Sequence, residues 1–343
     1  MPRSNKKILI TGGAGYVGQN LVYFFLKKKY QIYVLDNLST SSSINKSIKK
    51  KINFYKIDLT QESKVKNFFK KRNFDLIIHL AAFSGVQEFK KNVLKSFNNN
   101  VLSTKNLVNY GFKNPKTKLI FSSSAAIYGK VSREKISEHV AANPVNYYGI
   151  SKLACENIIE NSFKNKRNDY AILRYFNVVG SIVDFKIKKK VNALFDIIIN
   201  NIKKKKPKIN INGRDLNTKD GTPERDFIHI GDLCKIHEKA YKYLITNKKI
   251  ILNCGSGIRY SVLGVIKEFE KKLKKNFVIT YKIVNSDETK TICADISLLK
   301  ESFKVLVERG YTSDVAWHVC FYETQNILSL LNEKGYENFF NSV

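Results

Sequence analysis

The stretch Lys7-Ile8-Leu9-Ile10-Thr11-Gly12-Gly13-Ala14-Gly15-Tyr16-Val17-Gly18 decides the fold of this chain. It begins as a short apolar strand, and an apolar helical pattern follows it. Gly12, Gly15 and Gly18 have the spacing G-x-x-G-x-x-G. In such a loop the first glycine permits a tight turn, the second lets the backbone approach a pyrophosphate, and the third lets the helix pack close to its strand. The anion binds free backbone N–H groups at the helix N-terminus. The stretch therefore predicts a dinucleotide-binding unit.

A second strand, expected at Gln31 to Leu35, ends at Asp36, 18 residues after Gly18. A carboxylate at this position accepts hydrogen bonds from a ribose diol and repels a 2′-phosphate. The expected cofactor is therefore NAD rather than NADP. The alternative is a glycine-rich turn in some other α/β protein.

Short apolar strands alternate with helical patterns through the first half of the chain. This alternation predicts a parallel sheet with helices on both faces, and ligands bind beyond the carboxyl ends of its strands. We expect an α/β fold, a Rossmann-type doubly wound parallel sheet with a smaller, mixed α/β substrate-binding domain. The strand candidates are Ile8–Ile10, Ile32–Leu35, Phe54–Ile57, Leu76–Leu80, Lys118–Phe121 and Tyr170–Arg174.

The alternation ends after Gly180, where the chain becomes rich in lysine and less regular. We expect residues 1–177 to form the NAD-binding domain and residues 178–343 to form the substrate domain. A segment at about 227–253 reads as a helical unit followed by a strand, and it is expected to return to the first domain. The two domains would then interleave.

The composition is that of a globular protein, because 43% of the 343 residues are hydrophobic. The formal net charge of +31 suits nucleic acid or a membrane surface, but the lysines lie in short runs throughout the chain. We therefore expect lysines on solvated faces, no nucleic acid partner, and attraction of an anionic nucleotide substrate. No apolar run is long enough to span a bilayer.

The five cysteines are scattered along the chain, at positions 155, 234, 254, 293 and 320. No two of them have metal-ligand spacing, so we expect no metal site and reduced thiols in a cytoplasmic protein. The absence of an apolar signal region before Gly12 favours the same localisation.

Tyr148 and Lys152 share one face if the segment Tyr148-Gly149-Ile150-Ser151-Lys152 is helical. Free tyrosine titrates near pH ~10, and a neighbouring ammonium stabilises the phenolate and lowers that pKa. Beside a nicotinamide, the pair predicts a tyrosine that acts as a base. The same spacing also fits a tyrosine near a solvated lysine, because lysine is very common in this chain.

Several blocks in one order resemble the UDP-glucose (UDP-galactose) 4-epimerase family of extended short-chain dehydrogenases/reductases. The resemblance runs from Ile8 to about Trp317. The matching blocks are the glycine loop, Val34–Leu38, Ile78–Ala82, Asn99–Val101, Phe121–Gly129, Tyr148–Lys152, Leu173–Asn177 and Asp220–Leu233.

The resemblance implies that Ser124, Tyr148 and Lys152 are catalytic. Tyr148 would take the proton of the sugar C4 hydroxyl while hydride moves to NAD, and hydride would then return to the other face of the 4-keto sugar. Ser124 lies 24 residues before Tyr148 and would help to pass the proton. We expect Ser122 and Ser123 to form a turn and cap a helix instead.

The Ala125-Ala126 pair stands where relatives that dehydrate nucleotide sugars carry Asp-Glu. Without that acid/base pair, elimination of water is disfavoured. His79 and His229 are expected to be structural, because the sequence offers neither of them a partner for holding a metal.

The family's other functional residues also map onto this sequence. The resemblance implies cofactor contacts from Gly12, Gly15, Tyr16, Val17, Gly18, Asp36, Asn37, Asp58, Leu59, Leu80, Ala81, Ala82, Asn100, Tyr148, Lys152 and Phe176. It implies substrate contacts from Ser124, Tyr148, Asn177, Asn192, Leu194, Asn210, Asn212 and Arg225. Arg225 would hold a diphosphate with its bidentate fork, or else form a surface ion pair with its acidic neighbours.

Three positions depart from the family pattern. Ser84 replaces a lysine on the cofactor side, and Asn285 replaces a second phosphate-binding arginine, for which Lys290 and Arg259 are the candidate substitutes. Ile292 replaces a bulky aromatic that restricts the family to plain hexoses. The smaller side chain leaves room, so N-acetylated sugars are plausible substrates beside UDP-glucose and UDP-galactose.

Two questions of assembly and activity stay open at this stage. Family analogy suggests a homodimer through the apolar faces around Asn99–Tyr110 and Ser151–Phe163, although these faces equally fit packing on the sheet. The alternatives to a UDP-hexose 4-epimerase are a related epimerase or oxidoreductase for a UDP-pentose or UDP-uronate, and a non-enzymatic protein that binds a dinucleotide or nucleic acid.

Overall fold

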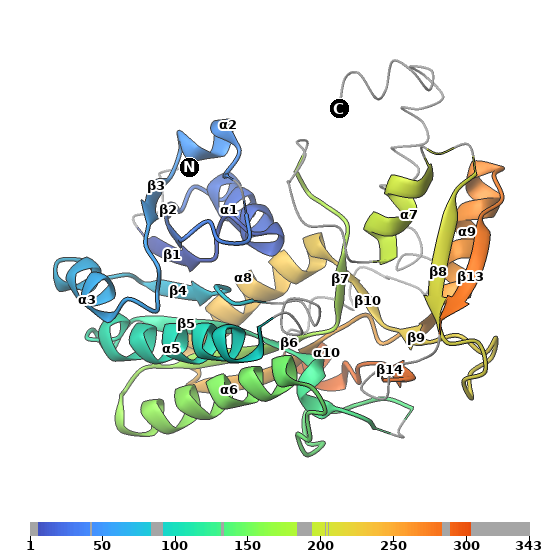
Figure 1. The fold of residues 1–343 in the computed structure, drawn as a ribbon. Helices are drawn as coiled ribbons and strands as arrows, with labels where there is room; N and C mark the ends of the chain where they lie inside the picture. Colours follow the sequence, from blue (N-terminus) through green and yellow to red (C-terminus); the bar gives the residue numbers. More distant parts are fainter. Residues whose placement is uncertain are drawn as a thin grey trace.

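The computed structural model describes residues 6–302, except for residues 42, 84–91, 132–133, 184–193, 203, 205 and 283–288. Within these ranges the chain forms two parts, a larger one built on a wide sheet and a smaller mixed one (Figure 1). Ser84, Asn192, Asn285 and Trp317 lie outside the described residues.

A seven-stranded parallel sheet forms the centre of the larger part, in the order β11-β6-β5-β4-β1-β2-β3. The order reverses direction between β1 and β4, and such a switch point is where ligands bind in open α/β sheets. All six expected strands lie in this sheet, which confirms the fold class. The strands are β1 (Lys7–Thr11), β2 (Gln31–Asp36), β3 (Asn53–Lys56), β4 (Leu76–His79), β5 (Lys118–Ser124), β6 (Tyr170–Tyr175) and β11 (Lys249–Cys254).

Helices cover both faces of this sheet, so its strands are apolar on both sides. In β1, Ile8 and Ile10 pack in the core beneath α1 and α8, whereas Leu9 packs in the core beneath α3, α5 and α6. The helices of this part are α1 (Tyr16–Lys27), α2 (Lys46–Lys49), α3 (Glu62–Lys70), α5 (Val93–Gly111), the 3-10 helix η1 (Ala125–Tyr128), α6 (Tyr147–Asn165), α8 (Ile230–Thr246) and α10 (Ser297–Ser302).

The smaller part has short sheets and a hydrophobic core of its own, which includes Ile198, Ile209, Ile266 and Phe269. Two parallel pairs, β7 with β10 and β8 with β13, flank a three-stranded sheet in the order β12-β9-β14. The elements are β7 (Asn177–Val179), α7 (Leu194–Ile202), β8 (Lys208–Asn212), β9 (Glu224–Arg225), β10 (Phe227–His229), β12 (Tyr260–Ser261), α9 (Val262–Leu273), β13 (Val278–Lys282) and β14 (Thr291–Ile292).

The chain returns from the smaller part to the large sheet through α8 and β11. α8 packs in the core beneath β1, and β11 pairs with β6 along its whole length. Within the segment expected at about 227–253, α8 and β11 therefore lie in the larger part, whereas β10 pairs with β7 in the smaller one. The exact limits proposed for the two domains, at residues 177 and 178, remain a prediction.

Asp226, between β9 and β10, hydrogen-bonds with the loop after β11 and with the residue two positions after β14. Its buried carboxylate accepts hydrogen bonds from the backbone N–H groups of Ser256 at 2.6 Å, Gly257 at 2.9 Å and Ala294 at 3.0 Å, and from the Ser256 hydroxyl at 2.7 Å. A buried carboxylate is tolerated when donors satisfy its oxygens in this way. The neighbouring residue Arg225 is thereby held where the parts meet.

A buried ion pair fixes α6 against the sheet. Arg174 of β6 donates from Nε and Nη2 to the Glu156 carboxylate of α6, at 3.2 and 2.8 Å. The guanidinium also donates to the Tyr128 hydroxyl at 2.9 Å, which in turn donates to Asn253 at 2.7 Å. Removing one partner would leave the other charge buried and unpaired, which costs about 3–5 kcal/mol.

Candidate active site

A cavity of about 820 Å³ lies beyond the carboxyl ends of the large sheet and extends to the smaller part. Its volume is within the range of small-molecule sites, roughly 300–1,000 Å³. Residues from both parts of the chain line it, from the glycine loop at one end to Arg225 at the other. A ligand of two linked groups can therefore contact both parts of the protein at once.

The glycine loop has the shape that a pyrophosphate requires. A Cβ on Gly18 would lie 2.3 Å from the Gly12 carbonyl oxygen, so the helix packs on the loop as the spacing predicted. Gly12 has φ +70°, which also favours glycine. Gly15 differs, because among the described residues its Cβ would meet only the Gly12 carbonyl oxygen, at 3.3 Å. Gly15 lines the cavity, so its missing side chain leaves space for a ligand.

Acidic side chains stand at the ends of β2 and β3, as the sequence indicated. Asp36 accepts the N–H groups of Leu38 at 2.8 Å and Ala14 at 2.9 Å, which braces the glycine loop. Burial raises the pKa of this carboxyl, against the effect of these two hydrogen bonds. Asn37 donates to Asp58 at 3.0 Å. Asp36, Asn37 and Asp58 all line the cavity, and with Gly15 they fit the adenosine and pyrophosphate groups of NAD.

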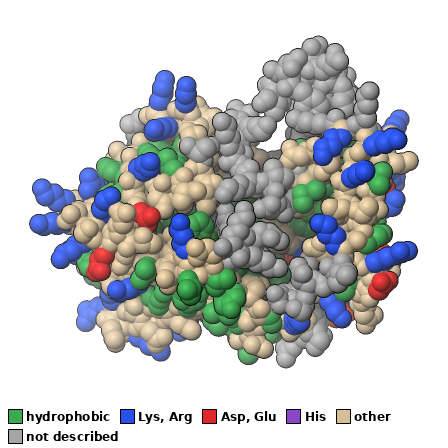
Figure 2. All heavy atoms as spheres, viewed as in Figure 1, with side chains coloured by type: hydrophobic (Ala, Val, Ile, Leu, Met, Phe, Trp, Pro, Cys, Tyr) green, Lys and Arg blue, Asp and Glu red, His purple; other side chains and the backbone are tan. Residues whose placement is uncertain are grey.

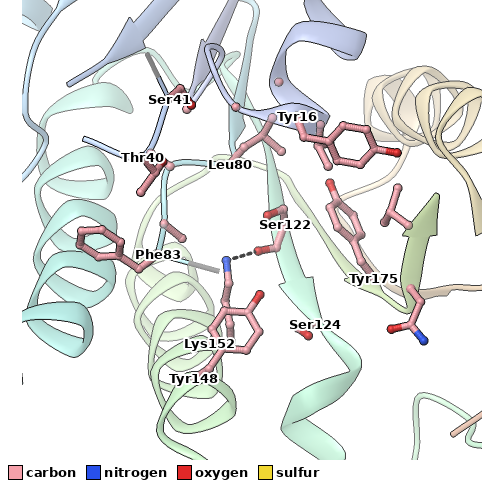
Figure 3. Close-up of a pocket in the computed structure, with 18 of the residues that line it drawn as sticks. Tyr16, Thr40, Ser41, Leu80, Phe83, Ser122, Ser124, Tyr148, Lys152 and Tyr175 are labelled. Atoms are coloured by element: carbon pink, nitrogen blue, oxygen red, sulfur yellow. Dashed lines mark hydrogen bonds between the residues drawn. The ribbon is translucent and has the colours of Figure 1, made fainter. Parts of the chain in front are cut away.

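Helix α6 carries Tyr148 and Lys152 into the cavity from the side of β5 (Figure 3). Asn146 caps its N-terminus by accepting the N–H of Gly149 at 2.8 Å. A Cβ on Gly149 would lie 2.4 Å from the Ala126 carbonyl oxygen, so this glycine lets α6 approach η1. The close approach brings Tyr148 next to Ser124, whose hydroxyl hydrogen-bonds with the phenol.

Lys152 is directed at the strand end more than at the phenol. Its Nζ donates to the Ser122 carbonyl oxygen at 2.7 Å, the dashed line in Figure 3. The same nitrogen lies 4.9 Å from the centre of the Phe121 ring and 5.9 Å from that of Tyr148. Burial lowers the pKa of Lys152 to about 8.

The sequence predicted that Lys152 lowers the pKa of Tyr148. For the side chains of the protein itself this prediction is wrong. Burial raises the pKa of Tyr148 to about 12, and the hydrogen bond with Ser124 offsets only part of this effect. The reason is that burial disfavours the charged phenolate, and Nζ of Lys152 lies 5.9 Å from the centre of the ring. The groups of the protein by themselves therefore favour the neutral phenol at neutral pH.

The roles expected for the serines of β5 also need correction. Ser122 and Ser123 belong to the strand and form neither a turn nor a cap. Ser124 is itself the cap of η1, because its Oγ accepts the N–H of Ala126 at 3.2 Å. The Ser124 hydroxyl therefore both caps η1 and hydrogen-bonds with Tyr148.

Most residues that the sequence assigned to the site come together in this cavity, and whether they contact ligand remains a prediction. The predicted residues that line it are Gly12, Gly15, Tyr16, Val17, Gly18, Asp36, Asn37, Asp58, Leu59, Leu80, Ala81, Ala82, Ser124, Tyr148, Lys152, Phe176, Asn177, Leu194, Asn210, Asn212 and Arg225.

Asn100 lies behind the wall of the cavity. Its amide binds the backbone of Phe83, accepting the N–H at 2.8 Å and donating to the carbonyl at 3.1 Å, and it also donates to Ser151 at 3.0 Å. Phe83 lines the cavity in its place. Asn100 therefore shapes the wall through its neighbour.

Several lining residues were not predicted, among them Tyr175, Phe195 and Phe227. Tyr175 is the last residue of β6. Because ligands bind beyond the carboxyl ends of parallel strands, its place at the end of an expected strand could have predicted that it lines the site. Phe195 and Phe227 come from the smaller part, where no regular alternation in the sequence locates the ends of elements.

On the substrate side, Arg225 donates to the carbonyl oxygens of Glu224 at 2.9 Å and Lys290 at 3.1 Å. Lys290 thus touches Arg225 through its backbone. Ile292 lies beside Arg225 in register, because β14 pairs with β9. The departure at Ile292 is therefore next to the residue expected to bind phosphate.

His79 and His229 have structural partners. His79 is buried between the hydroxyls of Thr11 at 2.7 Å and Thr104 at 3.1 Å, and burial lowers its pKa to about 3. His229 caps α8 by accepting the N–H of Gly231 at 3.1 Å. In the described parts of the chain, no group of three acidic, histidine or cysteine side chains is placed to hold a metal, and no helix has the length and apolar character that a membrane crossing requires.

Comparisons with known proteins agree with this geometry. UDP-glucose 4-epimerase from Drosophila melanogaster is 32% identical over 323 residues, which cover 88% of this chain and 92% of that protein. The solved structure of the UDP-Glc/GlcNAc 4-epimerase from Campylobacter jejuni is similar with a TM-score of 0.77 and 33% identity, over 94% of this chain and all of that one. A UDP-glucose 4-epimerase from Bifidobacterium longum, solved with NAD+ and UDP, gives a TM-score of 0.80 at 28% identity, over 94% of this chain and 99% of that one.

The family model described as NAD dependent epimerase/dehydratase matches residues 8–255, most of the chain. The same residues hold the glycine loop, Asp36, Ser124, Tyr148 and Lys152. The protein therefore belongs to the NAD dependent epimerase/dehydratase family.

Proposed function

We propose that the protein catalyses NAD-dependent epimerisation at C4 of a UDP-hexose through a transient 4-keto sugar. The observation that carries this proposal is the meeting of Ser124, Tyr148 and Lys152 in a cavity that also holds the glycine loop and Arg225. UDP-glucose 4-epimerases are among the proteins to which the chain is similar over most of its length.

NAD held by the glycine loop and Asp36 would supply the hydride acceptor for C4 and, in its positively charged nicotinamide ring, a charge that favours the phenolate of Tyr148. Tyr148 then takes the C4 hydroxyl proton, and Ser124 passes a proton between the phenol and the sugar oxygen. Lys152 holds a positive charge near the tyrosine ring while it stays bound to Ser122. Proton transfer by a positioned side chain typically contributes about 10²–10⁴-fold to the rate.

Arg225 is proposed to bind the diphosphate of the substrate. It lines the cavity on the far side from the glycine loop, and two carbonyl oxygens orient its guanidinium. Asn177, Leu194, Asn210 and Asn212 also line the cavity and are proposed to contact the sugar or the uridine. In this arrangement Arg225 holds the phosphate and the sugar presents C4 to Tyr148 and Ser124.

The sugar is proposed to be glucose or galactose, and the site is proposed to accept their N-acetylated forms as well. Ile292 lies in register with Arg225, and the resemblance implies that a bulky aromatic at this position restricts the sugar to plain hexoses. A shorter side chain leaves more space beside the sugar. We expect a UDP-sugar panel to show both classes converted.

We propose that two copies of the chain form a homodimer through α5 and α6. Large apolar side chains are exposed on both helices, namely Leu94 and Leu102 on α5 and Tyr147 and Ile150 on α6. Figure 2 shows apolar side chains gathered on this face, whereas the lysines are scattered over the surface. Exposed apolar patches commonly mark interaction sites.

A cytoplasmic location is proposed because the four described cysteines are free and buried.

The experiment that tests the proposal releases the bound cofactor for identification and assays UDP-galactose and UDP-N-acetylglucosamine with the same preparation. Interconversion without added NAD and without net NADH is the expected result. Accumulation of NADH, or turnover of a UDP-pentose or UDP-uronate alone, would favour the related oxidoreductase or epimerase. Salt-dependent DNA binding with no turnover would favour a non-enzymatic role.

A further inference from the structure

Two tyrosines besides Tyr148 line the cavity, Tyr16 and Tyr175. The Tyr16 hydroxyl donates to the backbone carbonyl oxygen of Gly180, and the proposed reaction gives Tyr175 no role. Tyr175 ends β6, its ring lines the cavity, and Figure 3 places it across the cavity from Tyr148 and Lys152. Because Tyr16 donates its proton to Gly180, the question is whether Tyr148 or Tyr175 exchanges protons with the sugar. The hydrogen bonds behind Tyr175 answer it.

The Tyr175 hydroxyl donates a hydrogen bond to His237 of α8. The His237 Nδ1 lies 2.8 Å from the Leu233 carbonyl oxygen, and a carbonyl can only accept, so Nδ1 carries the ring proton. Burial lowers the pKa of His237 to about 4, so the ring is neutral and its Nε2 has only a lone pair. Nε2 lies 2.7 Å from the Tyr175 hydroxyl, which must therefore donate its single proton to His237.

The chain of hydrogen bonds continues to the lysine. The Ser122 side chain hydrogen-bonds with Tyr175, and since the phenol proton is directed at His237, the Ser122 hydroxyl donates to the phenol oxygen. The carbonyl oxygen of the same serine accepts Nζ of Lys152 at 2.7 Å. Residue 122 thus joins a buried chain that begins at His237 to the ammonium group beside Tyr148.

We propose that His237 is a positioning residue that acts through Tyr175. It holds Tyr175 as a neutral, immobile wall of the cavity and, through Ser122, fixes the strand end that anchors Lys152. Tyr148, which hydrogen-bonds with Ser124, is then the phenol that exchanges a proton with the sugar. This inference rests on the proposed function and adds to it a residue that is fully buried and does not line the cavity.

Four variants of the NAD-loaded protein test this role. His237→Phe keeps the ring and loses the acceptor, while His237→Gln keeps an amide oxygen that accepts from Tyr175 and an amide nitrogen that donates to Leu233. Tyr175→Phe removes the hydroxyl, and the fourth variant combines His237→Phe with Tyr175→Phe. Tyr241→Phe is the matched control, because Tyr241 lies one turn further along α8, is buried and is remote from the cavity.

The readouts are kcat and KM for UDP-galactose, NAD retained per chain after gel filtration, and the midpoint of thermal unfolding. The loss of one hydrogen bond in this chain corresponds to about a 10-fold loss of kcat. KM should change less than ~2-fold, because Arg225, and not this chain, is proposed to bind the phosphate. We expect this loss and reduced NAD retention in His237→Phe and in Tyr175→Phe. The combined variant should lose no more than either, and His237→Gln should stay within ~3-fold of the wild type.

Multiplying losses in the combined variant would overturn the inference, as would a His237→Gln variant as weak as His237→Phe. A purely structural role would lower the unfolding midpoint in all α8 variants, Tyr241→Phe included, and leave kcat and NAD retention alone. If the wild type fails to convert any UDP-sugar, the proposed function fails. NAD retention still decides the inference in that case, because equal retention in the wild type, His237→Phe and Tyr175→Phe contradicts it.

Discussion

The ammonium of Lys152 lies 2.7 Å from the backbone carbonyl oxygen of Ser122 and donates a hydrogen bond to it. This contact holds the lysine at the end of β5, near the ring of Tyr148 and away from solvent. The lysine therefore acts on the tyrosine as a nearby charge held in place by the strand. The properties of the site follow from this arrangement.

Replacing Tyr148 by phenylalanine should abolish proton exchange and leave the fold intact. We expect kcat for UDP-galactose to fall about 10³-fold, while bound NAD and thermal stability remain near the wild type. Tyr147→Phe is the matched control, since Tyr147 precedes it in α6 and is 56% exposed. A Tyr148→Phe variant within a few-fold of wild-type kcat would rule out the tyrosine as the base.

The Ser124→Ala variant should show two separate effects. Loss of the proton-passing hydroxyl is expected to lower kcat by about 10²-fold, and loss of the cap on η1 to lower the free energy of unfolding by about 1 kcal/mol. Ser124→Thr retains a capping hydroxyl and should recover the stability. Kinetics and chemical denaturation of both variants separate the effects, and unchanged stability in Ser124→Ala would argue against the capping role.

Arg225→Ala should weaken substrate binding without affecting the cofactor. Loss of charged hydrogen bonds to a diphosphate corresponds to about a 10–100-fold rise in KM, with bound NAD unchanged. Arg214→Ala removes an exposed arginine of the same part of the chain that stacks on Tyr281, and it serves as the control. Equal KM values in the two variants would place the phosphate elsewhere.

Enlarging Ile292 should narrow the range of sugars. We expect Ile292→Tyr to lower kcat/KM for UDP-N-acetylglucosamine at least ~10-fold relative to UDP-glucose, because one lost methylene-sized space already costs about 10-fold or more in a tight pocket. Ile292→Val is the control that adds no bulk. The same ratio of kcat/KM values in all three proteins would show that this position does not select the sugar.

The two buried histidines should make the protein less stable in mild acid. The folded-state pKa is lowered from 6.5 to about 3 for His79 and to about 4 for His237, in both cases first by burial. The unfolded state therefore binds more protons below pH 6.5, and stability falls as the pH drops towards the folded-state pKa. Between pH 7 and pH 5 each histidine should account for about 2 kcal/mol of lost stability.

Denaturant unfolding of the wild type and of His79→Gln at pH 7 and pH 5 measures this share. The variant lacks one titrating ring, so its loss of stability over the interval should be smaller by about 2 kcal/mol. Equal losses in the two proteins would mean that His79 titrates in the folded state as it does in the unfolded state.

The larger part of the fold was predictable because its signals are local. Apolar runs gave the strands, and the spacing of Gly12, Gly15 and Gly18 gave the loop. A parallel sheet brings its strand ends together wherever they fall in the sequence, which is why Asp36 and Ser124 could be assigned to one site. The smaller part has short strands and no such alternation, so Phe195 and Phe227 were missed.

Tertiary contacts decided what the sequence alone could not. The raised pKa of Tyr148 comes from burial, which depends on how closely α6 approaches η1 at Gly149. The bond between Tyr175 and His237 joins residues 62 positions apart, and no spacing rule connects them. Asn100 was placed in the cavity by resemblance, yet its amide faces the backbone of Phe83.

The most direct test of reversible oxidation at C4 uses UDP-galactose that carries deuterium at C4. If hydride leaves C4 and returns to it within the site, the UDP-glucose formed should retain the deuterium at C4, with no net NADH and no loss of label to solvent. Failure to form UDP-glucose, or replacement of the deuterium by solvent hydrogen in the product, would contradict C4 epimerisation by transient oxidation.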